Sequence, residues 1–334
     1  MDGKGKRAKG KFFPRTDLAI EAREILGSEG EMDGIKITSE NAGDISITTV
    51  EILDEKGASQ MGKDIGTYIS IESTGMGEKD VSEREAVMKK TAEGLSRLMK
   101  ARGISHGDAV LVAGLGNRHI TADSLGPKVI DGVLATRHIT KTLPDELGRN
   151  VRPVCAIAPG VMGITGIETG EIICGINEKV RPKLIITIDS LAARKMSRIN
   201  SVIQMSDTGI SPGSGVGNTR MPLNEKVLGV PVIAVGVPTV VDAATLVNDT
   251  MERLISQMIQ GSRKGGEFYK MLGNLSFEDK YALILEILEP YEGNMFVTPK
   301  EVDSVVENLA NIISNAVNIA LQKNITMDDI NRFK

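Results

Sequence analysis

The sequence predicts an α/β fold with three layers, in which a mostly parallel, mixed sheet has helices on both faces and carries β-hairpin and helical insertions. Two observations support this class. Short apolar runs rich in Val and Ile recur along the chain, and amphipathic segments of helical period separate them. Alternation of this kind is typical of parallel sheets, because each crossover returns the chain through a helix packed on the sheet. The runs are 109–113, 151–158, 184–188 and 230–236.

Composition narrows the function classes. No apolar run is long enough to span a membrane, and the aromatic content of 3% without Trp argues against a base-stacking surface for nucleic acid. Cys155 and Cys174 lack the spacing of a zinc site, which indicates reduced thiols. We expect no signal peptide, because no apolar stretch follows the basic residues at the start of the sequence. We therefore expect a cytoplasmic protein without a membrane segment, direct nucleic-acid contact or cofactor.

The N-terminus differs in charge from the rest of the chain. Residues 1–17 hold six Lys/Arg and two Asp, whereas the whole chain has a net charge of −4. Residues 1–13 show no periodicity and are predicted to be disordered. This basic arm could bind a polyanion, or it could be a removable tail.

Ahead of the first parallel strand, the sequence predicts a short helix, a β-hairpin and a longer helix. Residues 16–24 form a short helix capped by Thr16 or Asp17. Residues 45–53 and 67–72 alternate in hydropathy and form a hairpin. A capping box at Ser82–Glu85 then begins a helix that runs to about 102.

The stretch 108–131 carries the strongest local signal for a site. Its apolar strand ends on Gly114-Leu115-Gly116-Asn117, a polar loop with His119 and Asp123 follows, and a helix runs on to about 138. Ligands bind at such strand-to-helix turns in α/β sheets. The turn lacks the third glycine of a dinucleotide fingerprint, so that interpretation is weak.

The second half of the chain contains two insertions. The region of about 205–225 is too rich in Gly, Ser and Pro for a core element, and 261–300 is predicted as a helical insertion with loops. A long helix at 242–259 and a final helix at 299–322 complete the fold.

Two aspartates follow predicted strands: Asp123 and Asp189. Parallel strands end at the same sheet edge, so the two carboxyls could converge and divide the roles of general acid and base. The alternative is that each aspartate caps the helix that follows its strand. Asp123 and His119 could also bind a metal ion. Most ligands of such a site would be carboxylates, because the chain has three histidines.

Several long motifs resemble the germination protease family of spore-forming bacteria. They are RTDLAIEARE from Arg15, GLGNRHITADSLGPKV from Gly114, PGVMGITGIETGEI from Pro159 and LIITIDSLAARKMSRINSVIQMSDTGISPGSGVGN from Leu184. The resemblance covers nearly the whole chain. The core is also similar to that of hydrogenase-maturation proteases, which share the glycine turn.

The resemblance implies an endopeptidase of atypical aspartic type with a phosphorylase/hydrolase-like fold, made as a zymogen that starts degradation of small acid-soluble spore proteins during germination. Its catalytic aspartates map onto Asp123 and Asp189. Family substrates are cut after the acid of Thr-Glu-(Phe/Ile)-Ala-Ser-Glu, and Thr16–Glu21 has the same order of side-chain types. We therefore predict self-cleavage between Asp17 and Leu18, which makes 1–17 a propeptide and 18–334 one peptidase domain.

The resemblance further implies a homotetramer in the forespore or spore core. Candidates for the cleft or for oxyanion stabilisation are Gly116, Asn117, His119, Gly163 and Glu168, and candidates for binding acidic substrate residues are Arg118, Arg194 and Arg198. Two other functions stay open: a metal-dependent maturation-type peptidase of the same fold, and a non-enzymatic polyanion-binding protein.

Overall fold

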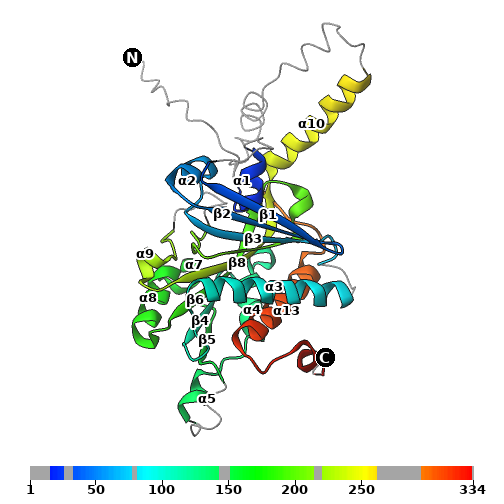
Figure 1. Cartoon of the computed structure of the whole chain (residues 1–334). Coiled ribbons are helices and arrows are strands. Elements are labelled where there is room, and N and C mark those ends of the chain that lie inside the picture. Colours follow the sequence, from blue (N-terminus) through cyan, green and yellow to red (C-terminus); the bar gives the residue numbers. More distant parts are fainter. Residues whose placement is uncertain are drawn as a thin grey trace, which may run out of the picture.

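The computed structural model describes residues 16–25, 33–76, 81–142, 151–213, 220–261 and 295–332. Within these ranges one nine-stranded sheet has the order β1-β2-β3-β7-β8-β6-β4-β5, with β9 paired to β8 (Figure 1). The predicted α/β class with a mixed sheet and helices on both faces is confirmed. The predicted disordered tail and most of the 261–300 insertion lie outside the described residues.

The sheet has a parallel part and an antiparallel part. Strands β5, β4, β6 and β8 are parallel, whereas β1, β2, β3, β7 and β8 pair in succession antiparallel, as β8 does with β9. The strands are β1 (Ile35–Ala42), β2 (Ile45–Ile52), β3 (Gly66–Glu72), β4 (Val110–Gly114), β5 (Val154–Ile157), β6 (Leu184–Ala193), β7 (Val202–Ser206), β8 (Val232–Asp242) and β9 (Phe296–Val297).

Strands β1 and β7 account for most of the difference from the predicted sheet. The sequence of β1 is IKITSENA, whose second half is polar and exposed, so its hydropathy does not alternate as a half-buried strand does. Strand β7 includes Met205 and Ser206, which we expected to begin a polar loop; both are buried between β3 and β8. That boundary was wrong because the buried pairing partners are distant in sequence.

The helices of the described residues are α1 (Ala19–Ile25), α2 (Glu55–Met61), α3 (Val81–Ala101), α4 (Leu125–Gly132), α5 (Arg137–Thr142), α7 (Met162–Thr165), α8 (Thr169–Val180), α9 (Glu225–Leu228), α10 (Ala243–Gly261), α13 (Val302–Leu321) and α14 (Met327–Arg332), with 3₁₀ turns η1 (Thr121–Asp123) and η2 (Met196–Arg198). The single helix expected up to residue 138 ends at Gly132, because Val133 takes an extended backbone. None of these helices is long and apolar enough to cross a membrane.

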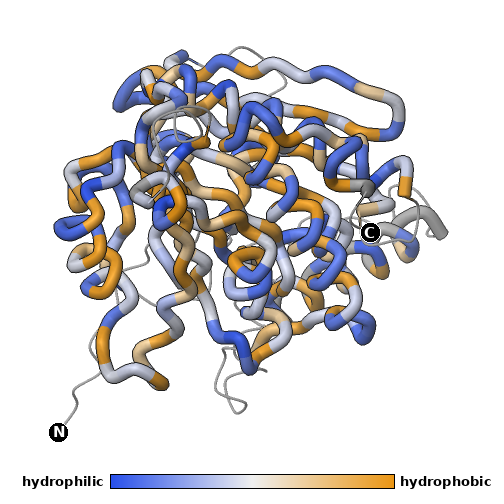
Figure 2. Tube along the Cα trace, turned by 90° about the horizontal axis from the view of Figure 1, so that it is seen from below, coloured by the Kyte–Doolittle hydropathy of each residue, from blue (hydrophilic) through white to orange (hydrophobic). Residues whose placement is uncertain are grey.

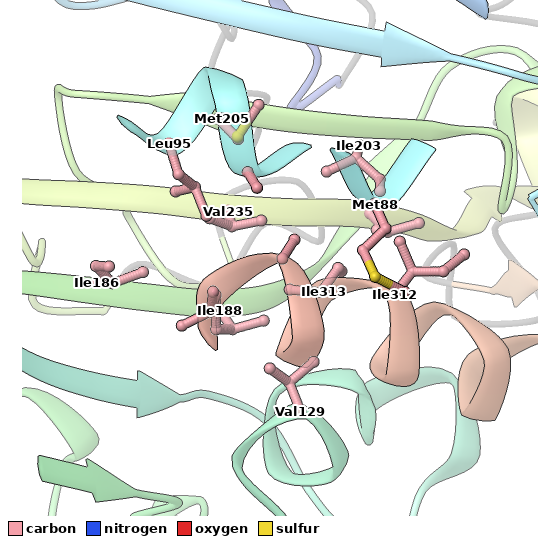
Figure 3. Close-up of a cluster of buried hydrophobic side chains, with 14 of the residues drawn as sticks. Met88, Leu95, Val129, Ile186, Ile188, Ile203, Met205, Val235, Ile312 and Ile313 are labelled. Atoms are coloured by element: carbon pink, nitrogen blue, oxygen red, sulfur yellow. The ribbon is translucent and has the colours of Figure 1, made fainter. Parts of the chain in front are cut away.

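Helices α3, α4 and α13 cover one face of the sheet. Hydrophobic stretches run through the middle of the molecule in Figure 2, and hydrophilic ones lie mostly at its periphery. In Figure 3 Met88 and Leu95 of α3, Ile312 and Ile313 of α13 and Val129 of α4 surround strand residues such as Ile188 and Val235. Full burial of each such side chain stabilises the fold by about 1.5–3 kcal/mol, so this face fixes the strands that carry the site.

The opposite face carries α1 and α8. Ile173 of α8 packs on Leu111 and Ile185, while Leu18 and Ile20 pack near the end of β6. Strand β4 ends at Gly114, opposite Ile188, whereas β6 continues to Ala193 and pairs there with β8. The last residues of β6 therefore have no strand paired with them on the side where β4 has ended. The candidate site lies along this open edge of β6.

Candidate active site

Asp123 is held by the glycine turn that ends β4. Its Oδ2 accepts a hydrogen bond from the Asn117 N–H at 2.8 Å, and its carbonyl accepts from the same N–H at 3.0 Å. Gly116 has φ +104°, and a Cβ there would lie 2.1 Å from the Asp123 carbonyl oxygen. Only glycine fits this close approach, so the turn fixes where the carboxyl stands.

Asp189 lies within β6, just past the end of β4. The residue is 7% exposed, and its Oδ1 accepts the N–H of Ser190 at 2.9 Å. Burial raises the pKa of the Asp189 carboxyl well above its ordinary value of 3.8, and the negative charge of Asp123 raises it further. Because burial disfavours the charged form, Asp189 retains its proton to a higher pH than an exposed aspartate does.

The two aspartates line one cavity of about 280 Å³, together with Gly116, Arg220 and Asp17. Burial also raises the pKa of Asp123, opposed by the Asn117 N–H and the charge of Arg220. Two carboxyls that each resist ionisation in one cavity titrate as a coupled pair. Such a pair can hold one proton and one negative charge at the same time.

Neither aspartate caps a helix. The N-cap position of α4 is Ser124, without a side-chain capping hydrogen bond, and Asp189 bonds the N–H that follows it inside the strand. Among the described residues no group of three His, Cys, Asp or Glu is arranged to hold a metal ion.

The other predicted site residues are more scattered. Gly116 lines the cavity, but the Asn117 N–H that we expected to be free for an oxyanion is bonded to Asp123. His119 and Gly163 are exposed, and Glu168 stands at the start of α8, where its Oε1 accepts the Met221 N–H at 2.6 Å. None of His119, Gly163 and Glu168 is among the residues lining the cavity.

The three arginines expected to meet acidic substrates also lie away from the cavity lining. Arg118 forms an ion pair with Asp131 at 2.6 Å, and Arg198 contacts Glu24 at 2.7 Å and Glu72 at 2.8 Å. Among the residues that the structure describes, Arg220 is the cationic one that lines this cavity. Sequence reasoning missed Arg220 because it follows a Gly/Ser-rich loop without a periodic pattern.

The chain around the predicted cut, Thr16–Leu18, lies on the open edge of β6. The Asp17 N–H donates to the Ala192 carbonyl at 3.2 Å, and the Ala192 N–H donates to Asp17 Oδ2 at 2.9 Å. Leu18 and Ala19 are fully buried. The predicted cleavage site is thus bound to the protein beside the aspartate cavity.

Helix α1 is anchored by a buried carboxylate. Glu21 is fully buried and accepts the N–H groups of Arg194 at 2.7 Å and Lys195 at 2.9 Å. Glu24 contacts Lys195 and Arg198 at the same end; these hydrogen bonds outweigh the effect of burial and lower its pKa to about 2. These contacts fix the position of the segment that bears Asp17.

The family model described as germination protease matches residues 16–270 and 257–334 of the sequence. The chain belongs to the germination protease family. A germination protease of Clostridium acetobutylicum is 50% identical over 321 residues, covering 96% of this chain and 98% of the relative. That of Clostridium tetani is 47% identical with the same coverage, and that of Bacillus mycoides is 40% identical, covering 96% of each.

Among solved structures, the nickel–iron hydrogenase maturation protease HycI from Thermococcus kodakarensis KOD1 aligns with a TM-score of 0.30 and 14% identity, covering 67% of this chain and 98% of that one. The family resemblance inferred from the motifs is confirmed. Membership of the germination protease family makes the protein a protease that acts in germination.

Proposed function

We propose that this germination protease is the zymogen of an aspartic-type endopeptidase that uses Asp123 and Asp189 to activate water. The observation that carries the proposal is their common cavity, in which burial raises both pKa values and Asp17 stands at the wall. A shared proton supplies a general base and a general acid from two chemically identical side chains.

The reaction follows from that arrangement. The ionised carboxyl takes a proton from a water molecule as the water oxygen attacks the peptide carbonyl. The protonated carboxyl then donates to the leaving nitrogen, and the C–N bond breaks. Because the pair titrates jointly, either aspartate can begin as the acid.

The first substrate is the protein's own Asp17–Leu18 bond, and removal of 1–17 produces the mature enzyme. The fixed position of Thr16–Leu18 on the edge of β6, beside the cavity, supports this choice. We further propose that the mature enzyme acts on small acid-soluble spore proteins in the spore core as a homotetramer, which the family resemblance supports.

Isosteric variants test the aspartate pair. Asp123→Asn and Asp189→Asn each remove one ionisable oxygen while keeping shape, and both should abolish loss of residues 1–17 as followed by intact mass at mildly acidic pH. Asp131→Asn is the matched control, since Asp131 is exposed and pairs with Arg118 outside the cavity. Processing at the normal rate in either folded cavity variant would remove that residue from the mechanism.

A further inference from the structure

A second cavity lies next to the one that holds the aspartates. Its volume is about 520 Å³, and its walls include Lys63, Tyr68, Gln204 and Ser206. Asp17 and Leu191 line both cavities. The residue before the predicted cut therefore stands between the aspartate pair and a second set of polar side chains.

The carbonyl oxygen of Asp17 points into this second set. It accepts a hydrogen bond from Lys63 Nζ at 3.0 Å and another from Gln204 Nε2 at 3.0 Å. The Gln204 Oε1 also accepts the Ala19 N–H at 2.6 Å. Gln204 thus bonds the peptide on both sides of Leu18 and fixes the orientation of the predicted scissile carbonyl.

Lys63 is a half-buried cation bonded to neutral acceptors. Its hydrogen bonds within the described chain go to the carbonyl oxygens of Asp17 and of Thr16, the latter at 3.3 Å. Burial lowers its pKa, while the charges of Asp17, Glu21 and Asp64 oppose that change. A desolvated ammonium is stabilised far more by a full negative charge than by a carbonyl dipole.

Hydrolysis creates such a charge at this oxygen. When the water oxygen bonds to the carbonyl carbon, the electron pair of the C=O bond moves to the Asp17 oxygen. When the C–N bond then breaks, the Leu18 nitrogen takes a proton, and Asp17 is left with an α-carboxylate. One water is consumed, and the charge next to Lys63 exists in the transition state and the product but not in the starting peptide.

On the basis of the proposed function, we propose that Lys63 and Gln204 form the oxyanion site of this protease. They bind the carbonyl of the acidic residue before the cut, while Ala192 binds that residue's N–H and side chain. The same site would take the main chain of a peptide substrate with Asp or Glu at this position. Donors whose interaction strengthens as charge develops raise kcat rather than lower KM.

The test measures processing and cleavage in the full-length chain. Lys63→Met keeps the aliphatic stem and removes the cation, and should slow loss of residues 1–17 by about a hundredfold or more, as is found when an oxyanion donor is lost. On a peptide substrate with Asp before the cut, the processed variant should lose kcat with little change in KM. Lys56→Met is the control, because Lys56 is exposed on α2 and pairs with Asp33.

Gln204→Leu provides a second variant, which decides the matter if Lys63→Met does not fold. It should also lower kcat, because one of the two donors is gone. An unchanged rate in folded variants would overturn the proposal. A faster rate would overturn it as well, since Lys63 and Gln204 would then hold the carbonyl away from the aspartates. Failure of the unmodified chain to process would instead count against the proposed function.

Discussion

Gln204 and Asp189 lie in one row of the sheet, on either side of Gly236. Their side chains therefore leave the same face, with Cα atoms about 10 Å apart across two strand spacings. The Leu191 side chain lies over Gly236, where a Cβ would come within 2.5 Å of Leu191 Cγ. Leu191 therefore forms part of the wall between the aspartate cavity and the Lys63 cavity, and it can stand there because residue 236 has no side chain.

Gly236→Ala should destabilise the protein by about 1–3 kcal/mol, the usual effect of adding a methylene to a packed site. The methyl group must displace Leu191, which packs on Leu18 and Ile20. Urea unfolding measures the change. In the double variant with Leu191→Ala the penalty of the added methyl should largely disappear; additive losses would show that the two positions do not compete for space.

Asp189→Asn should become more stable than the unmodified protein as pH rises. Because folding raises the pKa of Asp189, its contribution to stability is fully present below the ordinary value of 3.8 and is lost as pH rises toward the folded value. Asparagine does not titrate, so the difference should grow with pH by at most about 1.4 kcal/mol per unit.

Asp131→Asn should change stability with pH in the opposite direction in the same experiment. The hydrogen bond from Arg118 lowers the pKa of Asp131, so its contribution is present above the ordinary value and fades as pH falls. Urea unfolding across the acidic range should show the two variants diverging from the parent in opposite directions. A pH-independent difference for Asp189→Asn would contradict the raised pKa of the buried Asp189 carboxyl.

Glu21→Gln should lower the free energy of unfolding by about 2–3 kcal/mol, because hydrogen bonds to a charged group are the strong ones. The carboxylate is fully buried on the Arg194 and Lys195 N–H groups, and the amide can accept but not carry charge. Glu93→Gln is the control, since Glu93 is exposed and pairs with Lys90. Equal losses in the two variants would show that the anchor of α1 lies elsewhere.

Arg220→Gln should move the pH–activity profile to higher pH. The charge of Arg220 lowers the pKa of both cavity aspartates, and without it both would hold their protons longer as pH rises. Cleavage rates of a peptide substrate across pH give the measurement. Arg118→Gln removes a cation outside the cavity lining, and an equal shift there would indicate a general charge effect.

Much of the site was accessible from local sequence signals. The apolar run 109–113 and its glycine turn predicted the strand end that holds Asp123. The rule that parallel strands end at one edge then brought Asp189 to the same place. Pattern and topology brought the two aspartates together but left helix capping open, and the resemblance to the germination protease family selected them as a catalytic pair.

Lys63 and Gln204 could not be found in that way. Lys63 follows a short helix outside the predicted hairpin strands, and Gln204 belongs to a strand whose partners are β3 and β8. Their convergence on the Asp17 carbonyl depends on the register of antiparallel pairs and on the docking of α1. Neither the strand register nor the docking of α1 can be predicted from a periodic pattern in the sequence.

The most direct test of the account is the intact mass of the purified protein before and after incubation at mildly acidic pH, with and without a chelator. We predict loss of residues 1–17 whether or not chelator is present, with Leu18 as the new N-terminal residue. An unchanged mass would contradict self-cleavage at Asp17–Leu18. Processing that stops with chelator would contradict the aspartate mechanism in favour of a metal-dependent peptidase.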